Sequence, residues 1–261
     1  MTRVEYPVII LVSALASLAT LFSGFGLGTI LTPVFAIFFP VETAIAMTGV
    51  VHLSNNLFKT VLLGKKADWS VVLRFGIPSV IGAFIGAEVL LSITAIPAIT
   101  TWQQGSTVRT IHPVNVVIAL LMLTFAVMEF FPSKKESTMD RRWLAGGGVL
   151  SGFFGGLSGH QGALRAAFLV RYGLEKETFL ATGIIIACGV DLTRLSLYAS
   201  RWSAASVVEH SGLIIAAIVS AFAGAYLGRR LLTAVTLRFV QRSVAAMLVL
   251  IALALGGGFL S

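Results

Sequence analysis

The chain has 261 residues and a formal net charge of +8, and 57% of its residues are apolar while 11% are charged. A soluble domain carries about 25% charged residues, so this composition excludes an ordinary soluble protein. The bases lie in short loops between apolar runs, as the positive-inside rule of membrane proteins requires, and they do not indicate a nucleic-acid partner. The runs are continuous rather than alternating, which predicts an all-α polytopic protein in a lipid bilayer and not a barrel.

Ten hydrophobic segments are predicted in chain order, at residues 6–24, 28–40, 43–63, 72–92, 113–132, 144–158, 161–171, 178–199, 206–227 and 237–258. A helix needs about 20 apolar residues to cross the hydrocarbon core. The second, sixth and seventh segments are shorter than that. We therefore interpret segments 1–2 and 6–7 as helical hairpins whose tips can stop inside the membrane.

The basic residues of the loops predict the orientation. With both termini outside, Arg3, Arg109 and Arg201 lie outside, and the opposite arrangement would violate the positive-inside rule. We therefore expect the chain to be a multi-pass membrane protein. The predicted cytoplasmic bases are Lys65, Lys66, Arg74, Lys134, Lys135, Arg141, Arg142, Arg171, Lys176, Arg229, Arg230, Arg238 and Arg242.

The two halves of the sequence repeat one another. The matches are Gly28 with Gly162, Thr48-Gly49 with Thr182-Gly183, and "AFIGA" (Ala83–Ala87) with "AFAGA" (Ala221–Ala225). Chance similarity between glycine- and alanine-rich helices is the alternative explanation.

Each half holds five segments, and this odd number turns the second half upside down in the membrane. The predicted division is a first membrane repeat at 1–132, a cytoplasmic linker at 133–143 and a second, inverted repeat at 144–261. Inverted repeats with short, glycine-interrupted segments at matching positions are typical of secondary transporters.

These stretches resemble the sulfite exporter TauE/SafE family of bacterial membrane permeases. The resemblance implies anion transport, with sulfite, organosulfonates and related sulfur oxyanions as substrates. The features that carry it are "SGFGLGTILTP" (Ser23–Pro33), "AIAMTG" (Ala44–Gly49), "GKKADWSVVLRFGIPSVIGAFIGA" (Gly64–Ala87), "GGVLSGFFGGLSGHQGALRAAFL" (Gly147–Leu169) and "ATGIII" (Ala181–Ile186).

The glycine-rich tip of the second hairpin is the first candidate binding site. A short helix begins after Gly162, and its free N–H groups and positive dipole end favour an anion. Arg165, one turn along, could offer a fork of donors, while Gln161 and His160 could donate further bonds and His160 could carry a proton. The alternative is that Arg165 snorkels to the outer interface and the glycines only pack helices.

The counterpart tip in the first hairpin carries no charge. Gly24, Gly26 and Gly28 form the turn, and Thr29 and Thr32 supply polar groups after it, so the same helix-terminus argument applies from the cytoplasmic side. Helix packing alone explains these residues equally well.

A polar stretch on the third segment, "HLSNNLFK", is the next candidate. His52, Asn56 and Lys59 can share one helix face, with Asn55 beside them. Lys59 could neutralise an anion and the amides could donate to it. The alternative is that Lys59 snorkels to the cytoplasmic edge while the Asn pair joins helices.

On the eighth segment, Asp191 and Arg194 are three residues apart and can pair. One interpretation is a mutually neutralising structural pair. The other makes Asp191 a proton-binding group that releases Arg194 to the substrate when it is protonated.

The functional prediction is a secondary transporter that moves a small anion by alternating access, with a coupling proton and a homo-oligomer left open. A passive anion channel is the first alternative. A membrane subunit or enzyme of sulfur metabolism is the second, and we expect no enzyme, metal site or cofactor because no catalytic or ligand spacing is present.

Overall fold

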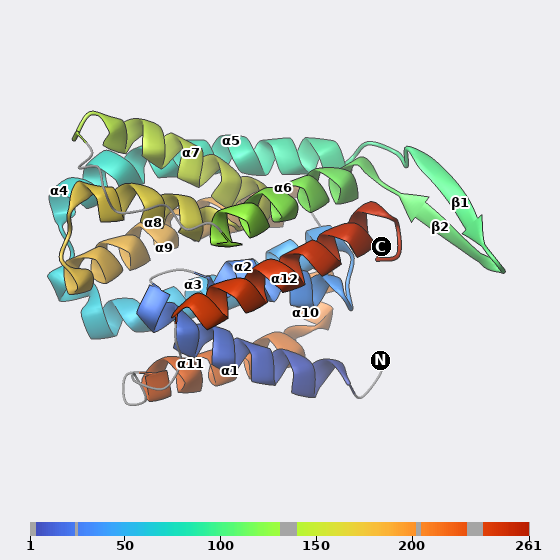
Figure 1. The fold of residues 1–261 in the computed structure, drawn as a ribbon, viewed down its shortest axis with the longest axis horizontal. Helices are drawn as coiled ribbons and strands as arrows, with labels where there is room; N and C mark the ends of the chain where they lie inside the picture. The colour runs from blue at the N-terminus through green and yellow to red at the C-terminus, as the bar shows by residue number, and fades with distance from the viewer. Residues whose placement is uncertain (1–3, 24–25, 131–139, 202–204, 229–236, 261) are drawn as a thin grey trace.

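The computed structural model describes residues 4–23, 26–130, 140–201, 205–228 and 237–260. Each of the ten predicted segments is helical within these ranges, and most boundaries agree to a few residues (Figure 1). The first half contains α1 (Glu5–Ser23), α2 (Leu27–Ala36), α3 (Val41–Leu63), the 3₁₀ turn η1 (Gly64–Lys66), α4 (Trp69–Val71), the π-helical turn η2 (Val72–Gly76), α5 (Ile77–Thr94), β1 (Thr100–Gln104), β2 (Thr107–Ile111) and α6 (Pro113–Phe130). The second contains α7 (Trp143–Ser158), α8 (Gln161–Tyr172), α9 (Lys176–Arg201), α10 (Ala205–Glu209), α11 (Ser211–Gly228) and α12 (Leu237–Gly256).

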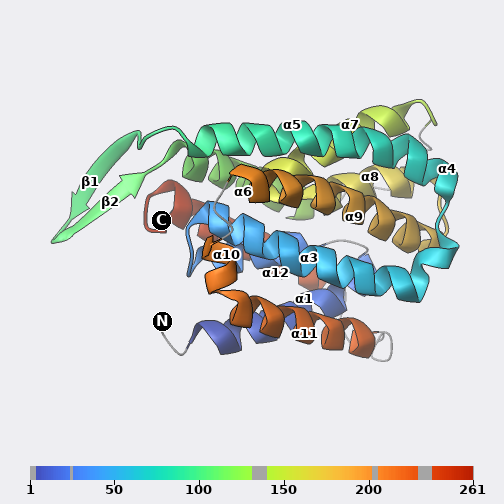
Figure 2. The same cartoon turned by 180° about the vertical axis from the view of Figure 1, so that it is seen from behind.

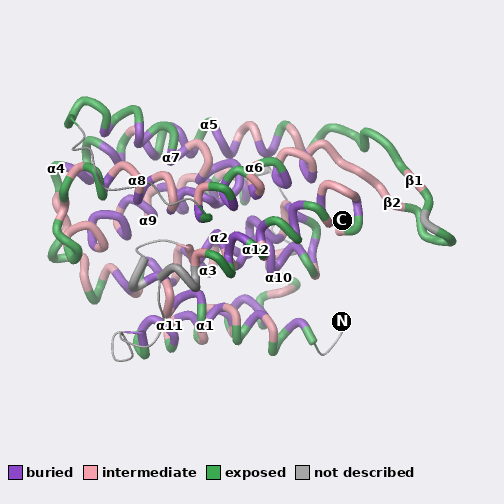
Figure 3. The backbone as a smooth tube through the Cα atoms, viewed as in Figure 1, coloured by how far each residue is buried: buried purple, intermediate pink, exposed green. Residues whose placement is uncertain are grey.

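The helices have the lengths and surfaces of a membrane protein. Large apolar side chains such as Phe84, Leu120 and Val219 are exposed. Figure 3 shows exposed stretches along the outer helices of the bundle. Such a surface suits lipid, so the protein has an all-α polytopic membrane fold, as predicted. Among the described residues, the stretches that are long and apolar enough to cross a membrane are Trp69–Thr94, Pro113–Phe130, Lys176–Ser200 and Ser211–Gly228.

The two halves pack through matching pairs of helices. α1 packs along α11 as α7 packs along α5, while α3 crosses α9 and α6 lies on α12. Figures 1 and 2 show that corresponding helices, such as α1 and α7 or α3 and α9, run in opposite directions along the long axis of the bundle. The inverted repeat stays a prediction. It requires equivalent helices of the two halves to run in opposite directions and to make equivalent contacts, and the pairings of α1 with α11 and of α7 with α5 have this form.

The repeated "FxGA" stretches explain two of these pairings. A Cβ on Gly86 would lie 2.0 Å from the Phe153 carbonyl oxygen, and one on Gly224 would lie 2.1 Å from that of Ala14. No side chain fits at such distances, so α5 contacts α7, and α11 contacts α1, backbone to backbone.

Three features were not predicted. β1 and β2 form an antiparallel hairpin that projects from the bundle, and its two-residue turn has Gly105 at φ +62°. The predicted segment 206–227 is divided into α10 and α11 at His210, and the fourth segment contains the π-helical turn η2. Most of the predicted linker, residues 133–139, lies outside the described residues, as does the Gly24 tip.

The bundle has two unlike ends. We call the end where α3 and α8 finish the basic end, and the opposite one the β-hairpin end (Figure 1). At the basic end Lys66 pairs with Glu177, and Arg141 donates to Ser70 Oγ. Lys134, Lys135, Arg229 and Arg230 lie outside the described residues. The exposed bases of η1, η2, α8, α9 and the start of α7 are Lys65, Lys66, Arg74, Arg141, Arg142, Arg171 and Lys176.

Candidate functional site

The two helical hairpins meet inside the bundle. α7 ends at Gly159, whose φ of +80° is a left-handed conformation that favours glycine, and α8 begins two residues later at Gln161. On α2, a Cβ at Gly28 would lie 2.9 Å from the Gly159 carbonyl oxygen. Gly28 therefore lets the start of α2 approach the tip of the other hairpin closely. This is the helix-packing role that was the alternative interpretation of this glycine.

A buried carboxylate lies where α3 crosses α9. Asp191 accepts from Arg194 Nε at 3.0 Å and from Gln161 Nε2 at 3.3 Å through Oδ1. Its Oδ2 lies 2.5 Å from His52 Nδ1, and since a carboxylate only accepts, Nδ1 donates. The predicted pair of Asp191 with Arg194 is present, but it belongs to a larger network that joins both halves.

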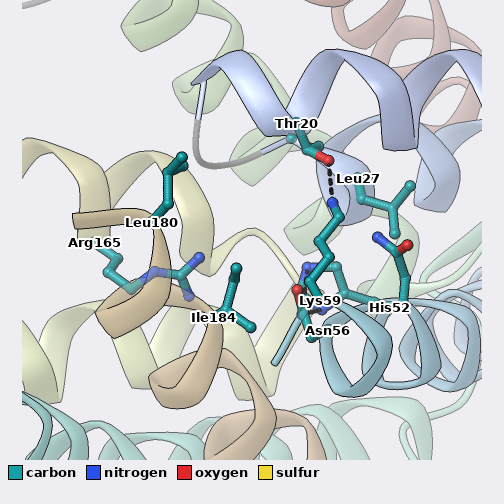
Figure 4. A pocket seen from close by; sticks show the side chains of 10 residues that line it. Thr20, Leu27, His52, Asn56, Lys59, Arg165, Leu180 and Ile184 are labelled. Carbon is teal, nitrogen blue, oxygen red and sulfur yellow. Dashed lines mark hydrogen bonds between the residues drawn. The ribbon is translucent and has the colours of Figure 1, made fainter. Parts of the chain in front are cut away.

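A pocket lies beside this network, on the side of the basic end. It holds about 380 Å³ of space, part of it open to solvent, and Figure 4 shows the Arg165 and Lys59 side chains entering it from α8 and α3. Four predicted site residues therefore share one pocket: Asn55, Asn56, Lys59 and Arg165. The complete lining is Thr20, Gly26, Leu27, His52, Asn55, Asn56, Lys59, Arg165, Leu180 and Ile184.

The two cations of the pocket are buried and lack acidic partners. Lys59 is 3% exposed and Arg165 is 4% exposed, so the snorkelling alternatives are wrong for this conformation. Lys59 Nζ donates to Thr20 Oγ1 at 2.6 Å, and Arg165 Nη1 donates to the amide oxygen of Gln161 at 2.9 Å. Among the described residues neither cation forms an ion pair with a carboxylate. The pocket therefore holds two basic groups that no described carboxylate contacts directly.

The Asn pair adds hydrogen-bond donors to this charge. Asn55 accepts the Ser17 hydroxyl through Oδ1 at 3.0 Å, while its buried Nδ2 has no hydrogen-bond partner among the described residues. Asn56 Nδ2 lies 3.1 Å from His52 Nδ1. Oδ1 of Asn55 is thus held by α1, while its free donor is available to a ligand of the pocket.

The other predicted residues do not line this pocket. His160 is buried, its ring stacks on Phe125 at 5.2 Å, and its Nδ1 lies 3.0 Å from the Ser158 carbonyl oxygen. Gly162 and Thr29 are buried within the first turns of α8 and α2. The helix N-terminus after Gly162, which we expected to bind the anion, is covered by the protein in this conformation.

Sequence reasoning missed the partners that hold the pocket together. Thr20 and Ser17 are ordinary small residues of an apolar helix, and Thr20 is 39 residues from the lysine it contacts. His52 and Asp191 are 139 residues apart. Neither contact leaves a periodic pattern, and only the fold brings these groups together.

Comparison with known proteins gives one match and one negative result. The family model for the sulfite exporter TauE/SafE matches residues 9–255. No curated protein matches the chain. Since the match covers the bundle from α1 to α12, the chain belongs to the sulfite exporter TauE/SafE family, whose members are membrane transporters of sulfur-containing anions.

Proposed function

We propose that this protein is a secondary transporter that moves a small sulfur oxyanion or organosulfonate across the bacterial inner membrane. The observation that carries the proposal is the pair of buried basic side chains, Lys59 and Arg165, which contact no carboxylate of the described residues and share one pocket. Burying a charge is costly unless a counter-charge is present, so an anionic ligand would stabilise both groups.

The donors of the pocket suit an oxyanion. A sulfite or sulfonate group has three oxygens that each accept hydrogen bonds. Arg165 could offer a fork of N–H groups and Lys59 a single ammonium, and the unpartnered Nδ2 of Asn55 gives a third donor. The three groups come from both halves of the chain, so a bound anion would join the two repeats.

Alternating access is supported by the packed region that closes the pocket on the side of the β-hairpin end. Toward the β-hairpin end, Gly28 packs on Gly159 and Arg194 is held by Asp191. This packed region of the bundle favours a carrier with two states over the alternative of a passive anion channel. It gives no support to a membrane enzyme or subunit of sulfur metabolism.

Proton coupling would act through Asp191. Its two oxygens are engaged by His52, Gln161 and Arg194, and Gln161 in turn accepts from Arg165. Protonation of the carboxylate would weaken the hold on Arg194 and Gln161, and so would couple a proton to rearrangement of the site. His160 is the second proton-coupling candidate, and its distance from the pocket makes it the weaker one.

Uptake of radiolabelled sulfite by proteoliposomes tests the function. The wild-type protein should show saturable uptake. Arg165→Ala should lower the ratio of maximal uptake rate to KM about 30-fold or more, as expected when a buried charge contact worth about 2 kcal/mol or more is lost. Arg171→Ala is the matched control, because this exposed arginine lies on the same helix outside the pocket. Full activity in Arg165→Ala would remove this residue from the site, and linear, non-saturating uptake would favour the channel.

A further inference from the structure

Arg194 uses only part of its guanidinium group to hold Asp191. Its Nε and Nη2 lie 3.0 and 2.9 Å from Asp191 Oδ1, on one side of the group. Its Nη1 has no hydrogen-bond partner among the described residues, although the side chain is fully buried. This nitrogen therefore remains available as a donor, although the Tyr198 side chain also interacts with the guanidinium group.

Two further buried polar atoms without partners among the described residues lie at or beside the turn between α7 and α8. Arg194 Nη1 and Thr32 Oγ1 lie 2.9 and 3.6 Å from the position that a Cβ on Gly159 would take. Thr32 is fully buried, and its hydroxyl has no partner among the described residues. His160 Nε2, on the residue after Gly159, is likewise buried and unpartnered. Buried polar groups are normally paired, so a cluster of unpaired ones calls for an explanation.

The repeat supplies an independent argument. Gly49 and Gly183 are matched positions, and a Cβ on them would lie 3.2 Å from Arg194 Nη2 and 3.3 Å from Arg165 Nε respectively. Each glycine thus makes room for one arginine. Arg165 faces the pocket on the basic side of Asp191, and Arg194 lies one turn further along α9, toward the β-hairpin end.

We propose that Arg194 Nη1 and Thr32 Oγ1, at the junction of the two helical hairpins, form a second oxyanion subsite on the β-hairpin side of Asp191. The inference rests on the proposed transport function. The anion leaves Lys59 and Arg165, passes Asp191 and is received by Arg194 when the protein opens toward the β-hairpin end. In the present conformation the subsite is buried and closed.

Thr32→Val is the cleanest variant, because valine has the shape of threonine and the Arg194–Asp191 pair is left intact. Uptake of radiolabelled sulfite is measured in proteoliposomes of fixed orientation, from each side separately. The KM from the β-hairpin side should rise about tenfold, which corresponds to one lost hydrogen bond to a charged ligand, while the KM from the basic side changes less than twofold. Ser54→Ala is the control, since this hydroxyl donates to the Val50 carbonyl of its own helix and lies outside the pocket.

Thermal unfolding of the purified Thr32→Val protein gives a second measurement. The hydroxyl has no partner among the residues that the structure describes, so its removal should leave the unfolding midpoint unchanged or raise it. A lower midpoint would show that the hydroxyl has a structural partner and would overturn the subsite.

The transport outcomes separate the two proposals. Equal changes in KM from both sides, or no change from either, would overturn the second subsite while wild-type transport stands. Wild-type vesicles that take up no sulfite from either side would overturn the proposed function and the subsite together.

Discussion

Asp191 neutralises part of a site that is otherwise rich in bases. Its carboxylate is fully buried and is contacted by His52 of the first half and by Gln161 and Arg194 of the second. A buried charge is tolerated when it is paired and its lone pairs are satisfied. Arg194 is stabilised in this way, whereas Lys59 and Arg165 of the pocket are not.

This difference predicts the effect of Asp191→Asn on stability. The substitution leaves Arg194 buried without a counter-charge, which should lower the free energy of unfolding by about 3–5 kcal/mol. Denaturant or thermal unfolding of the purified protein measures the change. Asp140→Asn is the control, because Asp140 pairs with Arg142 at an exposed site where one ion pair contributes about 1 kcal/mol or less. Equal losses in the two variants would show that Asp191 does not hold the centre of the bundle.

At the scale of elements, close contact between α5 and α7 depends on glycine. A Cβ on Gly152 would lie 1.9 Å from the Ser79 carbonyl oxygen, and one on Gly156 would lie 2.1 Å from that of Ala83. α7 carries the tip that ends at Gly159, so this contact also positions the second helical hairpin.

Two alanine substitutions on α7 test that contact. Gly152→Ala should force α5 and α7 apart and destabilise the protein by about 1–3 kcal/mol or more, the usual cost of overpacking. Gly146→Ala should be neutral or stabilising by up to about 1 kcal/mol, because nothing lies within 4 Å of its Cβ position and alanine favours helix. Thermal unfolding compares them, and a Gly152→Ala protein as stable as Gly146→Ala would disprove backbone contact here.

The elements could be predicted from the sequence because apolar continuity decides them. Helices such as α6 and α12 are unbroken apolar runs, and Gly159 stops α7 where the glycine-rich tip was expected. The break at His210 and the π-helical turn η2 leave no such signal. The β-hairpin lies in residues 93–112, for which no element was predicted, although Gly105 gives its turn.

Several residues of the site could be predicted from the sequence, but their arrangement in space could not. Asn55, Asn56, Lys59 and Arg165 stood out because polar groups are rare in apolar helices. Their convergence depends on how α3 and α8 both pack on α9, which no local spacing encodes. His160 lies outside the pocket because the turn between α7 and α8 places its ring against Phe125.

For the whole molecule, the distribution of charge gives the two ends different roles. Most exposed basic residues of the described part of the chain gather where α3 and α8 finish and α9 begins, and the pocket lies on this side of Asp191. If the positive-inside rule holds, this is the cytoplasmic side.

Cysteine labelling tests this orientation. In a Cys188→Ser background, Val108→Cys on the β-hairpin should react with a membrane-impermeant maleimide in intact cells, since residue 108 is exposed and lies on the predicted outer side. Lys66→Cys at the basic end should react only after the membrane is opened. The reverse labelling pattern would invert the predicted orientation and the sidedness of every transport measurement.

Equilibrium binding of radiolabelled sulfite to purified wild-type and Asn55→Asp protein tests the anion site most directly. Aspartate keeps the oxygen that accepts the Ser17 hydroxyl and replaces Nδ2, which has no partner among the described residues, by a negative oxygen in the pocket that Lys59 and Arg165 also line. The account predicts saturable binding to the wild type and an affinity about 100-fold lower or more in the variant, because a like charge beside the ligand costs several kcal/mol. Undiminished binding to Asn55→Asp, or no saturable binding to the wild type, would contradict it.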